Sequence, residues 1–234
     1  MVSVLKDIWT GLTDIIYPRV CPACDEVLGL EDRDICFTCR HTLPETDYHT
    51  FPGNPVAVHF WGKVPLTAAT ALYHFSKDGK VQHMLHHLKY KHRKDIGLLL
   101  GNFLAKTLKD HPVFSTCDLI VPVPLHPKKQ LQRGYNQSAV IAEGIAEKTG
   151  IPVGKDILIR NTYTATQTRK GRLERWQNVD GKFILTKPKA IAEKHILLID
   201  DVVTTGATLE ACAKVLLSQP GTKVAVAAVA HAEM

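Results

Sequence analysis

The sequence contains no uninterrupted apolar run of about eighteen residues, the length that indicates a transmembrane helix. Its 13 prolines and 15 glycines are too few for a fibrous or disordered chain of 234 residues. A Walker phosphate-binding loop and a dinucleotide-binding glycine fingerprint are also absent, so nucleotide hydrolases and Rossmann enzymes have no supporting motif. The remaining composition, 45% hydrophobic and 22% charged, is that of a globular protein with one sizeable core.

The first residues are apolar, yet they do not have the pattern of a signal peptide. Lys6, Asp7 and Asp14 interrupt the apolar run of residues 1–17, and no small-residue cleavage site follows it. Apolar residues recur there at helical spacing, which favours a short helix docked on the rest of the protein over a membrane-surface anchor. We therefore expect a cytoplasmic protein with no membrane span, whose free thiols stay reduced.

Charge is divided unequally along the chain. Residues 1–50 hold four basic and nine acidic residues, a net charge of −5, whereas the remainder holds 25 basic and 14 acidic residues, a net of +11. Between these parts, residues 44–55 contain three prolines and few apolar side chains, the composition of a linker. The sequence thus predicts an acidic N-terminal module over residues 1–50 and a basic body over residues 56–234, which favours anionic partners.

The module contains two CxxC pairs, a pattern that resembles a zinc ribbon. Each pair places two thiolates on a tight turn, and two such turns complete a tetrahedron around a structural Zn²⁺ with no open position for catalysis. A redox CxxC needs only one pair, and structural disulfides are not expected where thiols stay reduced. The expected zinc ligands are Cys21, Cys24, Cys36 and Cys39, while Cys117 and Cys212, isolated in the body, are expected to be buried small hydrophobes.

The body alternates between strand-like and helix-like segments, which predicts an α/β fold with a largely parallel sheet. Short apolar runs are typical of buried strands, and apolar residues at helical spacing are typical of amphipathic helices. The expected strands lie within residues 119–125, 196–199 and 224–230, and the expected helices within residues 81–109, 136–149 and 209–218.

The most informative passage follows the apolar run Ile196–Ile199. Two adjacent carboxylates, Asp200 and Asp201, stand where a parallel strand reaches the ligand-binding edge of its sheet, and they require cations or hydroxyl donors nearby. Three threonines, backbone N–H groups and a glycine then precede a helix, a combination that suits a phosphate. A purely structural turn would account for one Asp or one Thr, but not for the whole passage. The expected ligand carries a phosphate and sugar hydroxyls, with Mg²⁺ beside the carboxylates.

A basic loop after an earlier strand agrees with this interpretation. Residues 121–126 are followed by Lys128, Lys129 and then the sequence RGYNQ at residues 133–137, which leads into a helix. Lys128 and Arg133 are candidate contacts for the pyrophosphate end of the same ligand. Taken alone, the stretch is equally compatible with a solvated basic turn that has Asn136 as a helix cap.

The passage Ile196–Thr208 closely resembles the phosphoribosyl pyrophosphate (PRPP) signature of type I phosphoribosyltransferases, a hydrophobic strand followed by DDVVTTGAT. The resemblance implies that Asp200 and Asp201 face the ribose hydroxyls, directly or through Mg²⁺. In such enzymes a mobile loop closes over the site to exclude water, and residues 166–178 match its place in this chain. The 5′-phosphate would be held by Thr204, Thr205, Gly206, Ala207 and Thr208.

Together with the cysteine module, the whole pattern is similar to the ComF family, also called ComF/GntX. The resemblance rests on the two CxxC pairs, the LKY triplet at residues 88–90, expected to open a basic helix, and the passages VPVPL…RGYNQ and DDVVTTGAT. It implies a zinc ribbon fused to a type I phosphoribosyltransferase-like parallel sheet flanked by helices. Family members are competence-associated proteins linked to DNA uptake, so single-stranded DNA and DNA-uptake proteins are expected partners beside PRPP or a related phosphorylated sugar.

Two hypotheses for the function follow. In the first, the protein is a PRPP-dependent phosphoribosyltransferase that uses Mg²⁺ and acts on a nitrogenous acceptor beneath a hood within residues 56–75. In the second, the fold is a non-catalytic module that handles single-stranded DNA through its basic segments at residues 77–94 and 160–175. The histidines at positions 83, 86 and 87 are more typical of a solvated or polyanion-facing helix than of a metal site. No general acid or base stands out, and no signature names the acceptor.

Overall fold

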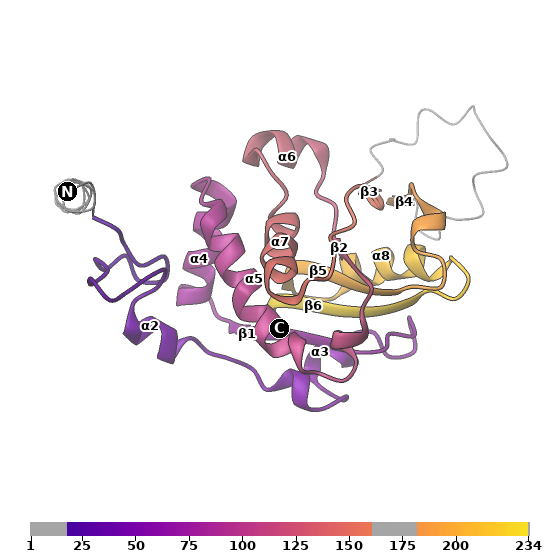
Figure 1. The fold of residues 1–234 in the computed structure, drawn as a ribbon, viewed down its shortest axis with the longest axis horizontal. Coiled ribbons are helices and arrows are strands. Elements are labelled where there is room, and N and C mark those ends of the chain that lie inside the picture. The colour runs from indigo at the N-terminus through magenta and orange to yellow at the C-terminus, as the bar shows by residue number, and fades with distance from the viewer. Residues whose placement is uncertain (1–17, 161–181, 234) are drawn as a thin grey trace, which may run out of the picture.

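A parallel four-stranded sheet forms the centre of the body (Figure 1). The computed structural model describes residues 18–160 and 182–233, so the predicted N-terminal helix and the predicted mobile loop at 166–178 lie outside the described residues. The strand order is β1-β6-β5-β2, and every pairing in this sheet is parallel. These strands are β1 (Ala69–Phe75), β2 (Leu119–Pro122), β5 (His195–Val203) and β6 (Lys223–Ala232).

The strand β5 is apolar on both faces because helices cover both faces of the sheet. Ile196 and Leu198 belong to one apolar cluster, and Leu197 and Ile199 belong to the other; all four are fully buried. A parallel sheet covered on both sides produces such a continuous apolar run, whereas a sheet covered on one side alternates. The predicted α/β class with a largely parallel sheet is confirmed.

Helices from different parts of the chain cover the two faces. The helices α4, α5 and α7 share one apolar cluster with Leu197 and Ile199, and α8 shares the other with the short helix α3. No helix among the described residues is both long and apolar enough to cross a membrane. The helices are α2 (Phe37–Thr42), α3 (Pro55–Val58), α4 (Lys80–Tyr90), α5 (Lys94–Lys109), α6 (Pro127–Arg133), α7 (Gln137–Thr149) and α8 (Ala207–Leu217). An antiparallel pair, β3 (Leu158–Arg160) and β4 (Phe183–Leu185), forms a second small sheet.

The helices α5 and α7 meet in close contact at two glycines. A Cβ atom on Gly101 would lie 2.2 Å from the carbonyl oxygen of Ile141, and one on Gly144 would lie 2.4 Å from that of Leu98. Only a residue without a side chain permits this approach of the two backbones. The contact holds α7 in the layer that packs on β5, and the first turn of α7 then reaches the end of that strand.

The ends of the helices follow local signals, with one difference from expectation. The side chain of Asn136 caps α7 by accepting the N–H of Ser138, and Gly150 ends the same helix in the left-handed conformation, with φ of 76°. The LKY triplet at residues 88–90 ends α4 instead of opening a helix, so that expectation was wrong. The apolar residues that define α4 begin at Val81, well before the triplet.

The segment at residues 44–55, predicted to connect the module to the body, packs along the outer edge of β1. Glu45 forms an antiparallel bridge with Tyr73, and the N–H of Thr46 donates to the carbonyl oxygen of Leu72 at 2.8 Å. Its proline and glycine content resembles that of a linker, but three of its polar or aromatic side chains are buried and fix it in place. These side chains are Thr46, Tyr48 and Asn54.

The other edge of the sheet is also occupied. Ile120 in β2 forms a parallel bridge with Val153, and the N–H of Gly154 donates to the carbonyl oxygen of Ile120 at 2.8 Å. The predicted hood at residues 56–75 needs correction as well, because its last seven residues are β1 itself. Only the part before β1 lies outside the sheet.

Candidate functional site

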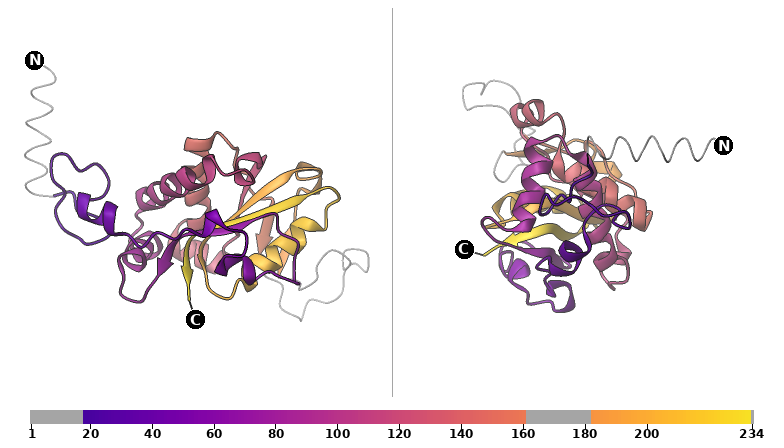
Figure 2. Two further views of the ribbon diagram at one scale, coloured as in Figure 1. Left: turned by 90° about the horizontal axis from the view of Figure 1, so that it is seen from below. Right: turned by 90° about the vertical axis from the view of Figure 1, so that its left-hand side faces the viewer.

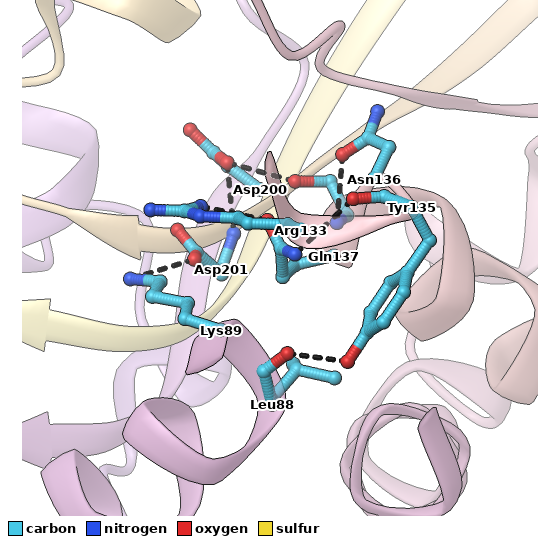
Figure 3. Close-up of polar contacts among 9 residues, drawn as sticks. Leu88, Lys89, Arg133, Tyr135, Asn136, Gln137, Asp200 and Asp201 are labelled. Atoms are coloured by element: carbon cyan, nitrogen blue, oxygen red, sulfur yellow. Dashed lines mark hydrogen bonds and ion pairs between the residues drawn. The ribbon is translucent and has the colours of Figure 1, made fainter. Parts of the chain in front are cut away.

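Two carboxylates lie at the end of β5, on the central part of the sheet (Figure 3). Oδ1 of Asp200 accepts a hydrogen bond from the hydroxyl of Ser138 at 3.0 Å and another from the backbone N–H of Asp201 at 2.9 Å. Asp201 forms an ion pair with Lys89, whose Nζ lies 2.8 Å from Oδ2. The three elements β5, α7 and α4 therefore converge on the pair.

Burial and the charge of Asp201 raise the pKa of the Asp200 carboxyl to about 7. The two hydrogen bonds to Oδ1 and the charge of Lys89 lower this pKa, but their effect is smaller than that of burial and of Asp201. A carboxyl with this pKa gains or loses its proton near neutral pH, and a cation bound beside it would hold it in the ionised form. The pair is thus suited to a divalent cation or to hydroxyl donors on a ligand.

The loop from Thr204 to Thr208 follows the carboxylates and leads into α8. Gly206 precedes that helix in the left-handed conformation, with φ of 73°. A Cβ atom there would lie 3.2 Å from the ring of Phe60, so both the backbone angle and the space favour glycine. A small pocket lies over the loop, lined by Asp200 and residues 202–209, and the threonines at 204, 205 and 208 are exposed beside it. The N–H groups of the first turn of α8 complete an anion-binding arrangement, although that of Ala207 donates to the hydroxyl oxygen of Thr205 at 3.4 Å.

The structure brings Arg133 toward this site but does not bring Lys128 there. The guanidinium of Arg133 lies 5.4 Å from the ring centre of Tyr90, the residue after Lys89, and donates to the side-chain oxygen of Gln137 at 2.8 Å. Figure 3 shows Lys89 and Arg133 extending toward the same region as the two carboxylates. Lys128 is exposed in the first turn of α6, which stands beyond α7 and away from the strands (Figure 1).

Sequence reasoning missed two residues of this site, Lys89 and Ser138. Lys89 stands in the LKY triplet and Ser138 directly follows the RGYNQ passage, so both positions lay in or beside motifs that had been noted. Their role was not visible because each acts through a contact between distant parts of the chain. The hydroxyl of Tyr135, also in RGYNQ, donates to the carbonyl oxygen of Leu88 and ties the α6–α7 connection to the end of α4.

The four cysteines of the module gather in one cluster, as predicted. The Sγ atoms of Cys21, Cys24, Cys36 and Cys39 all lie within 4.8 Å of one another. Those of Cys24 and Cys36 are 3.8 Å apart, and two sulfurs bound to one tetrahedral zinc ion at about 2.3 Å each have nearly that separation. Burial raises the pKa of the Cys24 thiol to about 11, so a bound metal would have to displace its proton. The cluster fits a tetrahedral thiolate site.

The module lies at one end of the molecule, next to α4, as the two views of Figure 2 show. Cys21, Ile35 and Cys39 belong to the same apolar cluster as Leu85 and Leu88 of α4. Cys117 and Cys212, by contrast, are buried in the body as expected, and burial raises the pKa of the Cys117 thiol to about 12. Both body thiols are therefore neutral.

A separate cavity lies apart from the carboxylates. It has a volume of about 570 Å³ and is lined by residues 48–69 and the 111–114 turn, with Tyr48, Trp61 and Phe114 among them. Phe60 lines this cavity and also contacts the position of Gly206. The cavity is mostly apolar, so it is less suited to a charged ligand than the loop at residues 204–208.

The chain is similar to the phosphoribosyl transferase domain family and to proteins named for DNA utilization and competence. The phosphoribosyl transferase domain family matches residues 136–233. DNA utilization protein YhgH of Salmonella typhimurium is 30% identical over 146 residues, which cover 61% of this chain and 63% of that protein. Competence protein F of Haemophilus influenzae is 35% identical over 42% of this chain and 44% of its own length. Competence protein ComFC of Bacillus subtilis is 25% identical over 87% of this chain and 91% of its own length. The match to the first of these relatives thus spans less than two thirds of its length.

Replacing Asp200 with Asn should stabilise the ligand-free protein at neutral pH. The folded state raises the pKa of this carboxyl, so the stability that it contributes is fully present at low pH and is lost as pH rises toward about 7. Asn keeps the Oδ1 acceptor without the charge. In thermal unfolding between pH 4 and 8, the variant's midpoint should match that of the wild type at the acid end and exceed it by a few degrees near pH 8.

The matched control is Asp110→Asn, at the exposed C-terminal end of α5. Its thermal midpoint should follow that of the wild type across the range. A difference between Asp200→Asn and the wild type that shrinks as pH rises would contradict the assignment of a strained, ionised carboxylate at position 200.

Proposed function

The chain belongs to the ComF family, whose fold is that of the phosphoribosyltransferases, and we propose from this that its body binds PRPP together with Mg²⁺. The observation that carries the proposal is the placement of Asp200 and Asp201 beside an exposed phosphate loop, at the end of a parallel strand. Ligands of α/β proteins bind at this edge of the sheet. An acidic pair next to an anion-binding loop suits one ligand that carries both ribose hydroxyls and phosphates.

Each part of PRPP has a matching group in this site. The 5′-phosphate would bind the N–H groups and hydroxyls of residues 204–208, and the ribose hydroxyls would face Asp200 and Asp201, directly or through Mg²⁺. Lys89 and Arg133 are better placed than Lys128 to contact the pyrophosphate. In the free protein Lys89 neutralises Asp201, and the arriving cation would take over that role and release Lys89 for the ligand.

The chemistry that follows is glycosyl transfer. The bond from the ribose C1 to the pyrophosphate oxygen breaks and its electron pair leaves with pyrophosphate. A nitrogen of the acceptor forms the new bond to C1 and releases its proton to solvent. Mg²⁺ supplies charge neutralisation on the leaving group. The carboxylates of Asp200 and Asp201 stabilise the positive charge that develops on the ribose ring, while Lys89 and Arg133 hold the departing anion.

PRPP with Mg²⁺ should raise the thermal unfolding midpoint of the wild-type protein, because a ligand that binds only the folded state stabilises it. Asp200→Asn and Asp201→Asn should each weaken the affinity at least about tenfold, since each removes a charge that faces the cation. Affinity should also fall as pH drops below the Asp200 pKa of about 7, and this fall should be less steep in Asp200→Asn, where only the phosphate groups of the ligand still titrate. Calorimetric titration between pH 6 and 8 measures both effects.

The Asp110→Asn variant again serves as the control and should bind as the wild type does. Pyrophosphate release in the presence of a panel of nucleobases tests turnover separately. Absence of any Mg²⁺-dependent stabilisation by PRPP contradicts the binding proposal. If PRPP stabilises the protein but no base leads to release of pyrophosphate, the binding proposal holds and the proposal of glycosyl transfer is contradicted.

For the N-terminal module we propose a structural Zn²⁺ held by Cys21, Cys24, Cys36 and Cys39. The sulfur separations and the all-thiolate donor set support it, and four protein ligands leave no position for a substrate. Because such a small module has little core of its own, metal binding would supply part of its folding free energy. Four thiols kept available for metal require reducing conditions, so we also propose a cytoplasmic location.

Replacing Cys21 and Cys36 together with Ser should remove this zinc ion and unfold the module. Metal analysis of the purified chain by mass spectrometry should show the loss, and limited proteolysis should show new cleavage before residue 44. The double variant Cys117→Ser/Cys212→Ser is the control for metal content. Retention of the same zinc content in Cys21→Ser/Cys36→Ser would overturn the assignment.

A second function is favoured by the exposed basic surface and by the names of the relatives, which refer to DNA utilization and competence. Lys128 and Lys129 are exposed on α6, whose Leu131 is 88% exposed, and Arg133 stacks near Tyr90 at the end of the same helix. Clustered cations beside an exposed aromatic ring are the elements of single-stranded nucleic acid binding. We propose that this surface binds single-stranded DNA.

The double variant Lys128→Ala/Lys129→Ala should weaken binding to a fluorescent oligonucleotide of single-stranded DNA. Because two phosphate contacts are lost, the negative slope of log affinity against log salt concentration should become less steep by about 1.4. Fluorescence anisotropy at several salt concentrations measures it. Lys109→Ala/Lys148→Ala, exposed at the ends of α5 and α7, is the charge-matched control. Equal slopes for both double variants would exclude α6 as the DNA-binding surface.

A further inference from the structure

One residue of the cysteine module and two residues of α4 form a group outside both sites described above. Asp25 follows Cys24 in the first CxxC turn, and His83 and His87 lie on α4. One ligand atom from each of the three lies within 4.8 Å of the other two. We propose that this group binds a second divalent metal ion of the zinc type, which joins the module to the body.

The separations fit a metal ion. Nε2 of His83 lies 3.1 Å from Oδ2 of Asp25, and two ligands bound to one tetrahedral zinc ion at about 2.0–2.1 Å lie about 3.3 Å apart. His83 and His87 are four residues apart, so they project from the same face of the helix. Their ring centres are 4.3 Å apart and the ring planes are inclined at 68°. Two helical histidines and one carboxylate are a donor set that zinc accepts.

An ion pair between His83 and Asp25 does not account for the whole group. Nε2 of His83 and Nδ1 of His87 are shielded from solvent, and neither makes a hydrogen bond in the described structure. The 3.1 Å approach to Asp25 is therefore close but not aligned for donation from the ring. Shielded polar nitrogens without partners are costly. A cation between the three side chains would use both nitrogens and the carboxylate at once.

The backbone of the module directs Asp25 toward α4. Its φ of 60° lies in the left-handed region, which Asp tolerates better than most residues. The N–H of Asp25 donates to the carbonyl oxygen of Cys21 at 2.9 Å, so the turn that presents the cysteines also fixes Asp25. Three protein ligands leave the fourth position to water, which distinguishes this site from the closed thiolate cluster. Since α4 also carries Lys89, the ion would link the module to the element that pairs with Asp201.

Cobalt substitution in the full chain tests the proposal, because Co²⁺ reports on its own ligands. The wild type, freed of metal and titrated with Co²⁺, should bind about two ions per chain. The first should show the intense thiolate-to-cobalt absorption of the cysteine cluster. The second should add only the weaker visible bands of nitrogen and oxygen ligands. His83→Ala, His87→Ala and Asp25→Asn should each weaken the second binding event at least about tenfold and keep the thiolate band.

The control is His86→Ala, an exposed histidine on the same helix that is outside the group and stacks with Tyr90. It should bind both ions as the wild type does. The thiolate band shows in each variant that the module is still folded, so a lost second ion cannot be confused with unfolding. Saturation of the wild type at one ion per chain overturns the proposal. Equal loss of the second ion in His86→Ala and His83→Ala does so too, because it would assign the ion to the histidine-rich surface in general.

Discussion

The adjacent carboxylates of Asp200 and Asp201 are the constraint on which the rest of the site depends. Two acidic side chains near the end of a buried strand repel each other. The hydroxyl of Ser138 on α7 donates to Asp200, and Lys89 on α4 forms an ion pair with Asp201. The donor Ser138 is held in place by the close packing of α7 on α5, at two positions where any side chain would collide with the facing helix. The compensation is incomplete, as the raised pKa of Asp200 shows, and this remaining strain is what a cationic ligand would relieve.

The cysteine module is attached to the body more firmly than its composition suggests. Its cysteines share an apolar cluster with α4, and Asp25 reaches the histidines of the same helix. The two ends of α4 therefore contact different parts of the protein. Its first turns face the module, and its last turn places Lys89 beside the carboxylates. This one helix therefore connects the cysteine module to the two carboxylates. The boundary between module and body at residues 50–56 stays a prediction, because no observation separates the two parts.

The sequence predicted those features that local chemistry determines. The run of apolar residues in β5 and the cluster of four cysteines each depend on short passages of sequence, so spacing alone predicted them. The partners of Asp200 and Asp201 escaped prediction because Ser138 and Lys89 reach them from distant elements, and no local pattern records a contact of that kind. Lys128 was predicted as a contact because it lies in a basic stretch after a strand, whereas that stretch forms an exposed helix. The packing of residues 44–55 on β1 was not predicted for a related reason: composition does not show the few buried side chains that anchor a segment.

The segment at residues 44–55 has a further effect on how the protein can associate. A parallel sheet normally ends in strands whose outward N–H and C=O groups can pair with a strand from another chain. Here residues 44–46 occupy such groups on β1, and the stretch around Val153 occupies those on β2. Both margins of the sheet are therefore closed to strand addition over these stretches. A protein or nucleic acid partner has to dock on helices, loops or side chains, and backbone pairing is not available to it there.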